Sequence, residues 1–396
     1  MGALTDWAEL LGRWLHLTTG IAWIGSSLYF IWLDNHLTPP ESPADRKNGV
    51  AGELWAVHGG GFYQAQKYAG APPEMPATLH WFKWEAYSTW LSGMFLLILI
   101  YWLGAEVYLI DSSVLALSHG AAVGIGAAYL LGGWIVYDQL CKSPLGRNDR
   151  VLSTVLFGFL VLIAWSLCQV FGGRGAFIHY GALIGTIMVA NVAHIIIPGQ
   201  RRMVRALETG EPINPADGAR GKQRSVHNTF LTLPVLFVMI SNHYASTYSG
   251  DWNWLVLIGM TVAGALIRVY FVARHKGDAS LLPAVGGVAA LAATAVIANG
   301  LPTFREAPTD QQQAPSIAEV QAVVSARCTG CHAAVPTWPG FASAPAGIVL
   351  EHRDDIEKYA DSIYEQTVVL KAMPIGNLTE ITDEERAVVE AWYRSR

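Results

Sequence analysis

The sequence predicts an all-α fold: a polytopic membrane helix bundle of about eight transmembrane helices, followed by a small soluble helical domain. Three observations predict it. Hydrophobic residues make up 52% of the 396 residues and charged residues only 14%, which is far from the average of a soluble globular protein. Apolar runs of about 20 residues, long enough to cross a bilayer as helices, alternate with loops. After Gly300 the composition becomes polar and is punctuated by proline.

The membrane part is expected to cover residues 1–300. Its predicted spans are 9–33, 84–104, 112–137, 151–171, 177–197, 228–248, 253–273 and 281–300. The long first loop contains the stretch AVHGGGFYQAQKY, for which we expect a short amphipathic or re-entrant piece. Residues 301–315 have the composition of a linker. Residues 316–396 then form a compact domain of the usual small size.

Basic residues gather in alternate loops, which indicates the orientation of the bundle. The fifth loop alone carries six between Arg201 and Arg224, whereas the opposite side has only Arg13 and Arg174 before the C-terminal domain. Loops rich in Lys and Arg stay in the cytoplasm, so both termini are expected outside. The net charge is −5 and the basic clusters are short, so nucleic acid is not an expected partner.

Residues 327–332 read RCTGCH, the spacing of two cysteines and a histidine that covalent attachment of a c-type haem requires. Cys328 and Cys331 would attach the haem, and His332 would supply one axial nitrogen to the iron. A zinc site would need two further ligands, and the only other histidine of this domain is His352. The motif therefore predicts haem c.

Met373 is the only methionine of the C-terminal domain and precedes a proline. It follows a predicted helix at 354–370 and is the expected sixth iron ligand, since a thioether raises the reduction potential. SIAEVQAVVSARC and TDEERAVVEAWYRSR each begin with an N-cap residue and an acidic first turn, which predicts the first and last helices of a small cytochrome. The domain resembles class I cytochrome c. Haem is attached to such motifs on the outer face of a bacterial inner membrane, so we expect this domain on the periplasmic side.

Ionisable side chains inside the spans are costly and are candidates for function. An outer layer contains His16, His119, His179 and His243. Along the first span, His16 shares a helical face with Arg13, Gly20 and Trp23. We interpret His16, His119 and His243 as candidate ligands of a haem b in the bundle. The alternative is that these histidines hydrogen-bond to neighbouring helices.

An inner layer contains polar residues within or beside four predicted spans: His80, Glu85, Asn191, His194, His227, Asn228 and Arg268. Arg268 lies at least one turn inside its span, which predicts an anionic partner. That partner is either a carboxylate, Glu85 or Asp34, or an anionic substrate that enters from the cytoplasm, because a guanidinium offers paired donors. Both alternatives remain open at this point.

Several motifs together resemble those of the bacterial membrane-bound urate oxidases that carry a C-terminal cytochrome c domain. These are GRWLHLTTGIAWIGSSLYFIWLDNHL, ELWAVHGGGFYQAQKY, LHWFKWEAYSTWLSG and the terminal CTGCH and MPIGN. The likeness covers essentially the entire chain and the order of its domains. The first span is also similar to the first helix of the membrane protoporphyrinogen oxidase and copper-resistance membrane families.

The resemblance implies oxidation of urate to 5-hydroxyisourate, with electrons passed to haem c and onward to the respiratory chain or a soluble cytochrome, without peroxide. From depth and chemistry we expect His194, His227, Arg268 and Asn191 to bind urate, with an imidazole accepting a proton. A two-electron donor and a one-electron haem call for a radical intermediate or a second redox centre. The other interpretations are a quinol-linked or purely electron-transfer membrane cytochrome, and a transporter fused to cytochrome c.

Overall fold

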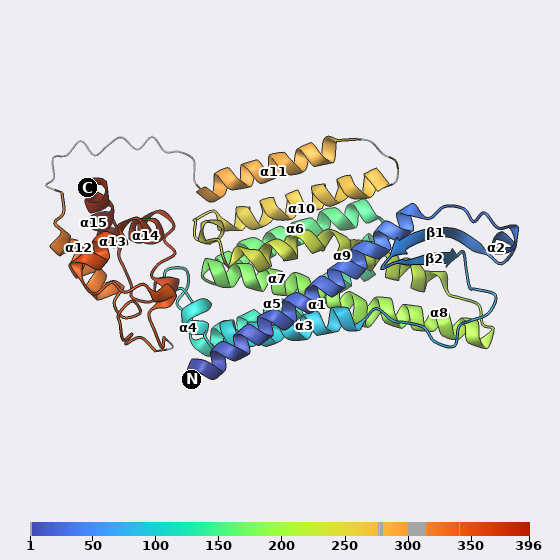
Figure 1. The fold of residues 1–396 in the computed structure, drawn as a ribbon, viewed down its shortest axis with the longest axis horizontal. Coiled ribbons are helices and arrows are strands. Elements are labelled where there is room, and N and C mark those ends of the chain that lie inside the picture. Colours follow the sequence, from blue (N-terminus) through green and yellow to red (C-terminus); the bar gives the residue numbers. More distant parts are fainter. Residues whose placement is uncertain (1, 276, 278–279, 300–313, 340) are drawn as a thin grey trace.

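The computed structural model describes residues 2–275, 277, 280–299, 314–339 and 341–396, so most of the predicted linker 301–315 lies outside the described residues. The chain is predominantly helical, as predicted. Long helices run side by side in a bundle, a small helical domain lies at one end of it, and a β-hairpin lies at the other (Figure 1).

A helix occupies each of the eight stretches predicted as spans. They are α1 (Gly2–His36), α3 with its π-helical continuation η1 (Trp84–Leu96, Leu97–Trp102), α5 (His119–Lys142), α6 (Asp149–Cys168), α7 continuing through η3 into α8 (Gly173–Ala190, Asn191–Ile196, Ile197–Thr209), α9 (Pro215–Ser241), α10 (Asn253–His275) and α11 (Leu282–Asn299). Within the described part of the chain, five helices are long and apolar enough to cross a membrane: α5, α6, the continuous α7–α8, α10 and α11.

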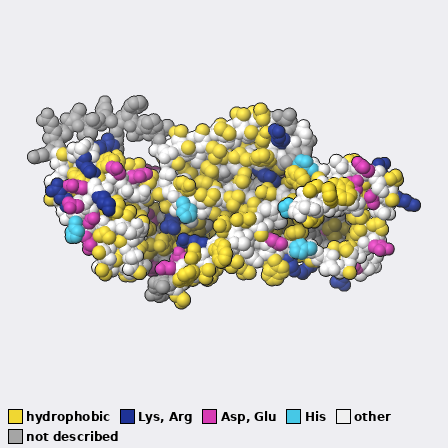
Figure 2. All heavy atoms as spheres, in the orientation of Figure 1, with side chains coloured by type: hydrophobic (Ala, Val, Ile, Leu, Met, Phe, Trp, Pro, Cys, Tyr) yellow, Lys and Arg dark blue, Asp and Glu magenta, His cyan; other side chains and the backbone are white. Residues whose placement is uncertain are grey.

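Apolar side chains dominate the middle of the bundle surface, and charged side chains gather toward its two ends (Figure 2). Leu131, Leu162, Trp165 and Val288 are among the large apolar side chains that the bundle leaves exposed. A soluble protein rarely exposes apolar patches of this extent, because contact between apolar surface and water is unfavourable. Contact with the lipid tails of a bilayer removes that unfavourable free energy. The chain is that of a membrane protein.

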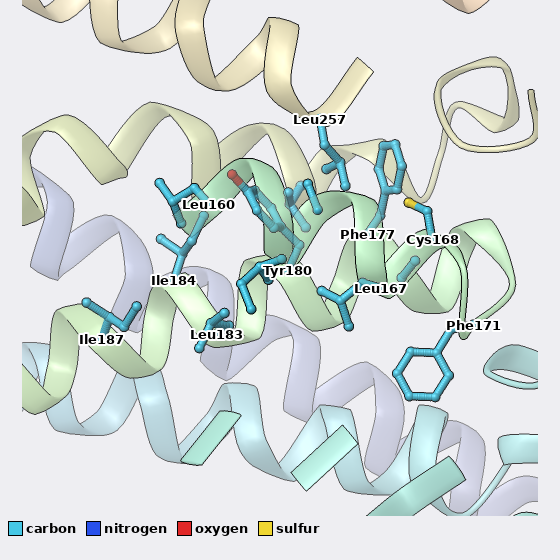
Figure 3. Close-up of a cluster of buried hydrophobic side chains, with 14 of the residues drawn as sticks. Leu160, Leu167, Cys168, Phe171, Phe177, Tyr180, Leu183, Ile184, Ile187 and Leu257 are labelled. Carbon is cyan, nitrogen blue, oxygen red and sulfur yellow. The ribbon is translucent and has the colours of Figure 1, made fainter. Parts of the chain in front are cut away.

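Helix α7 forms the centre of the bundle, and its side chains Phe177, Tyr180, Leu183 and Ile184 are fully buried (Figure 3). Glycine lets the neighbours approach closely. A Cβ added at Gly133 of α5 would lie 2.3 Å from Leu183 Cδ1. Since lipid tails are as apolar as leucine, this close packing, rather than exclusion of water, holds such helices together.

The first loop differs from the sequence prediction. AVHGGGFYQAQKY forms an antiparallel β-hairpin, not an amphipathic or re-entrant piece, with β1 (Val50–His58) and β2 (Gly61–Tyr68) preceded by the short α2 (Pro43–Lys47). Gly59 and Gly60, at the turn, both have positive φ, 58° and 81°. A two-residue turn with positive φ at both positions matches the twist of paired strands, which accounts for the hairpin.

The C-terminal domain contains α12 (Ile317–Arg327), α13 (Arg353–Lys358), α14 with the π-turn η6 (Ala360–Tyr364, Glu365–Val369) and α15 (Asp383–Arg394). The predicted first and last helices are confirmed, and both begin with a capping box, Ser316 with Glu319 and Thr382 with Glu385. Helices α12, α13 and α15 share a separate apolar core that includes Val320, Ile356 and Trp392.

Gly376 lies where the C-terminal domain contacts the helix bundle. It lies in the 3₁₀ turn η7 (Ile375–Asn377), which packs on the short helix α4 (Ala105–Tyr108) at the end of the bundle. A Cβ added at Gly376 would lie 2.8 Å from the Ile110 carbonyl oxygen. The segment that follows Met373 therefore contacts the bundle directly.

Candidate functional site

The residues of the C-terminal motif surround one cavity of about 120 Å³. Cys328, Cys331, His332 and Met373 all line it, and the rest of its wall is largely apolar, including Phe341, Ile348, Leu350, Tyr359, Ile363 and Leu378. The structure thus brings together the two cysteines, the histidine and the methionine that the sequence assigns to haem c. Such a set, facing a largely apolar space, fits the group that the motif predicts.

The tautomer of His332 suits an iron ligand. Its Nδ1 lies 2.9 Å from the Ile348 carbonyl oxygen, and because a carbonyl only accepts, Nδ1 carries the proton and Nε2 keeps its lone pair. Met373 is held by its backbone: its N–H donates to the Gln366 carbonyl at 3.0 Å, and Arg386 donates to its carbonyl at 3.1 Å. Both predicted axial residues are fixed by hydrogen bonds that leave the ligand atoms free.

Nothing among the described residues supports the alternative of a structural metal site. No group of three or more His, Cys, Asp or Glu in that part of the chain could hold a metal ion. Burial raises the pKa of the Cys328 thiol to about 11.

A larger cavity, of about 420 Å³, lies in the half of the bundle nearer to the C-terminal domain. We call it the outer cavity, and helices α1, α3, α7 and α9 and their extensions supply its walls. His16 and His243 both line it. His119 does not: its Nδ1 lies 2.7 Å from Glu106 Oε1 and its side chain is exposed. The structure therefore brings together two of the three histidines assigned to a membrane haem.

His179 is fully buried and both its ring nitrogens are used. Nδ1 lies 2.9 Å from the Gly175 carbonyl, and Nε2 accepts a hydrogen bond from Trp102 Nε1 at 3.1 Å. These bonds match the alternative considered from the sequence, a histidine that links neighbouring helices.

In the other half of the bundle, toward the β-hairpin, Asn191 and His227 meet in one hydrogen-bonded network, which we call the inner cluster. Asn191 Nδ2 donates to Tyr137 Oη at 3.0 Å and to Asn228 Oδ1 at 2.9 Å, and Tyr137 Oη lies 2.8 Å from His227 Nδ1. Asn191 begins η3, a π-helical turn within the long α7–α8 helix. Turns of this kind occur frequently at functional sites.

Sequence reasoning missed three members of the inner cluster. Tyr137 is not among the residues that the sequence indicated. Asp138 and Arg224 are both buried, and their side chains form an ion pair with 2.9 Å between Nη2 and Oδ1. Nη1 of Arg224 also donates to Asn191 Oδ1 at 3.4 Å. One signal in the sequence could have indicated the pair: the stretch YDQLCK places a single carboxylate at the end of an apolar run, close to a loop rich in basic residues. Hydropathy alone does not say which arginine it meets.

Arg268 has no carboxylate partner among the described residues. Asp34 binds Lys67 at 2.8 Å and Glu85 lies 3.8 Å from His80, so neither carboxylate proposed for Arg268 pairs with it. Arg268 is buried, and its Nε and Nη2 atoms have no hydrogen-bond partner. These two atoms lie on one edge of the guanidinium, where paired donors can bind a planar anion.

The packing of α10 against α9 shows the depth of Arg268. Gly264 of α10 lies against Pro234 of α9. Arg268 lies one turn further along α10, which corresponds on the antiparallel α9 to about Phe230, within roughly one turn of His227 and Asn228, because adjacent helical turns are about 5.4 Å apart. His194, the fourth predicted residue, is exposed, with its ring centroid 5.2 Å from that of Trp134; no hydrogen bond described in the structure joins it to the inner cluster.

Comparison with known proteins gives one finding. The model of the family described as urate oxidase N-terminal matches residues 2–299, which include the whole bundle, the inner cluster and the outer cavity. No curated protein and no solved structure matches the chain.

Proposed function

Because this chain belongs to the urate oxidase N-terminal family, a family of oxidoreductases related to urate oxidase, we propose that it oxidises urate to 5-hydroxyisourate within a membrane. We propose further that the electrons pass to a haem c in its own C-terminal domain, and from there to the respiratory chain or a soluble cytochrome. The reaction adds one water to urate and releases two protons and two electrons. Oxygen is not reduced, so no peroxide forms.

The observation that carries the proposal is the unpaired edge of Arg268. A buried guanidinium without a partner is costly, and its Nε and Nη2 atoms are both without one. Urate is a planar monoanion at neutral pH, with adjacent oxygen and nitrogen acceptors that suit a two-pronged donor. Binding of urate would satisfy both donors and neutralise the charge.

The inner cluster supplies the proton chemistry. Because Asn191 donates to Tyr137 Oη, the hydroxyl proton is free to point at His227 Nδ1, 2.8 Å away. If His227 takes a proton at Nδ1, the same bond persists with the tyrosine oxygen as acceptor. His227 and Tyr137 can therefore hold a proton released from urate without breaking the network.

The C-terminal cavity would hold haem c through Cys328 and Cys331, with His332 and Met373 at the iron. When bound, haem c accepts one electron at a time, and methionine ligation gives it a raised reduction potential. The basic loops favour a bacterial inner membrane protein whose termini and haem domain face the periplasm. Urate made inside the cell would then reach the inner cluster from the cytoplasmic side.

The test is an anaerobic visible spectrum of the oxidised full-length protein mixed with urate. We expect reduction of the c-type haem, with consumption of urate and no peroxide. Arg268→Gln should weaken urate binding and slow the reduction, with an unchanged c-haem spectrum. Arg274→Gln is the matched control, because Arg274 lies on the same helix but is exposed and bonded to Tyr270. Reduction by a quinol but not by urate would instead identify an electron-transfer cytochrome and refute the proposal.

A further inference from the structure

The outer cavity has the size and the walls of a cofactor site. Its volume of about 420 Å³ falls within the range of roughly 300–1,000 Å³ that small-molecule and cofactor sites occupy. Its walls are mostly apolar and include the indole of Trp23 and several glycines. Gly185 is one of them, and a Cβ added there would meet no atom within 4 Å. The space beside α7 is therefore open to a bulky, flat group.

His16 offers a nitrogen to that space. Its Nδ1 lies 3.0 Å from the Thr89 carbonyl oxygen and 3.1 Å from Ser92 Oγ. Since the carbonyl only accepts, Nδ1 carries the proton, and Nε2 keeps a lone pair that no hydrogen bond described in the structure uses. Gly93 leaves room for the ring, because a Cβ there would lie 2.9 Å from His16 Cε1. An imidazole fixed in this way resembles a metal ligand oriented by its second nitrogen.

His243 provides a second imidazole on the same cavity from another helix. It follows α9, whose C-cap is Asn242, and its side chain is exposed. No side-chain hydrogen bond of His243 is present among the described residues. Two imidazoles with free nitrogens thus face one apolar space from α1 and from the end of α9.

The outer end of the cavity is positively charged. Arg13 and Arg174 both line it. Arg13 is bonded to Glu9, but Arg174 forms no ion pair within the described part of the chain; its Nε donates to Tyr101 Oη at 3.3 Å. Tyr101 donates in turn to Asn242 Oδ1 at 3.1 Å. An unneutralised guanidinium at the mouth of an apolar cavity is suited to a carboxylate on its occupant.

From these observations we propose that the outer cavity binds a non-covalent b-type haem, with His16 and His243 as axial ligands and Arg13 and Arg174 as partners of its two propionates. The proposal deepens the proposed function and rests on it for its role, because a bound one-electron centre between the inner cluster and haem c would separate the two electrons of urate. The position of the outer cavity in the fold is consistent with this role. Tyr101 and Arg174 adjoin Tyr108 of α4, the helix on which η7 of the haem c domain packs.

The experiment is a pyridine haemochrome assay of the purified full-length protein after chemical reduction, which separates b-type from c-type haem by their absorption bands. We expect equal amounts of the two. His16→Ala and His243→Ala should each lose the b-type haem and keep the covalent c-type haem, which serves as an internal standard. His119→Ala, a histidine of the same layer outside the cavity, should keep both.

Three further variants distinguish loss of the haem site from misfolding. Gly185→Phe should fill the cavity and exclude the haem without touching a ligand, whereas Gly158→Phe should not, because Gly158 has equally open surroundings but lies exposed on α6. His16→Gly should regain a low-spin b-type spectrum when imidazole is added.

Protein with only c-type haem, whose cavity releases a quinone or an acyl lipid on solvent extraction, would overturn the proposal. So would a b-type haem that survives in both His16→Ala and Gly185→Phe. The assay needs no urate, so the two proposals fail separately: a protein that contains both haems but is not reduced by urate would refute the proposed function and leave the haem site standing.

Discussion

Asp138 is the residue on which the inner cluster depends for charge balance. It accepts from Arg224 Nη2 at 2.9 Å and from Lys142 Nζ at 2.6 Å. The guanidinium of Arg224 also lies 5.0 Å from the centre of the Tyr137 ring, over its face. Since Arg224 is buried and Asp138 is its carboxylate partner, loss of the carboxylate should destabilise the whole inner cluster.

Asp138→Ala is expected to destabilise the protein by about 3–5 kcal/mol, the usual cost of leaving one member of a buried ion pair alone. The measurement is the thermal unfolding of the detergent-solubilised protein. The double replacement Asp138→Leu with Arg224→Met removes both charges and should recover most of the loss. Glu208→Ala, at an exposed position of α8, is the control and should have little effect. A double variant less stable than Asp138→Ala would show that the pair is not the cause.

Hydropathy indicates how deep a polar residue lies in the bundle, but not the direction in which its side chain points. Hydropathy placed Asn191, His194 and His227 at one level of the bundle, and the structure joins Asn191 and His227 while His194 lies exposed beside Trp134. Helical periodicity shows which residues share a face, but not which neighbouring helix that face meets. The same limit explains why His119 was grouped with His16 although Glu106 holds it outside the cavity.

At the scale of elements, the sequence predicted where helices lie better than where they begin. The third helix was predicted over 112–137 and runs from His119 to Lys142. The apolar residues before it form a turn instead, in which Asp111 accepts from the Ser113 N–H, and Ser118 caps the helix by accepting from the Ala121 N–H. A local capping side chain decided the boundary, where hydropathy alone is ambiguous.

We predict that the contact between η7 and α4 sets the rate of electron transfer into the haem c proposed for the C-terminal domain. Gly376 has φ +56°, and a Cβ added there would lie 2.8 Å from the Ile110 carbonyl oxygen and 3.6 Å from the Val107 carbonyl oxygen. Gly376→Ala should therefore push the two elements apart. We expect slower reduction of haem c by urate with an unchanged c-haem spectrum, measured by stopped-flow absorbance. Gly347→Ala is the matched control, because Gly347 also has a positive φ, 68°, but no atom within 4 Å of an added Cβ. Equal rates in the two variants would mean that backbone strain, not the contact, is responsible.

At the scale of the whole molecule, the candidate sites follow one another along the length of the bundle. The β-hairpin and the C-terminal domain lie at opposite ends of the bundle (Figure 1). The inner cluster lies toward the hairpin end, and the outer cavity lies toward the C-terminal end, where Arg174 and Tyr101 meet α4. A substrate bound at the inner cluster and a haem held beyond the outer cavity would therefore lie on opposite sides of the apolar middle, so the proposed electron transfer would run from the hairpin end to the C-terminal end.

This arrangement predicts a definite topology. A single cysteine placed at Gly59, in the hairpin turn, should react with an impermeant maleimide only after the inner membrane is permeabilised, whereas a cysteine at Ser395 should react in intact spheroplasts. The native thiols interfere little, because Cys141 and Cys168 are buried and Cys328 and Cys331 would be bonded to haem. The positive charge of the basic loops beside the hairpin is the reason for expecting this side in the cytoplasm. Labelling of Gly59→Cys in intact spheroplasts would show that the molecule has the opposite orientation, with the inner cluster toward the periplasm. That result would refute a supply of urate from the cytoplasm.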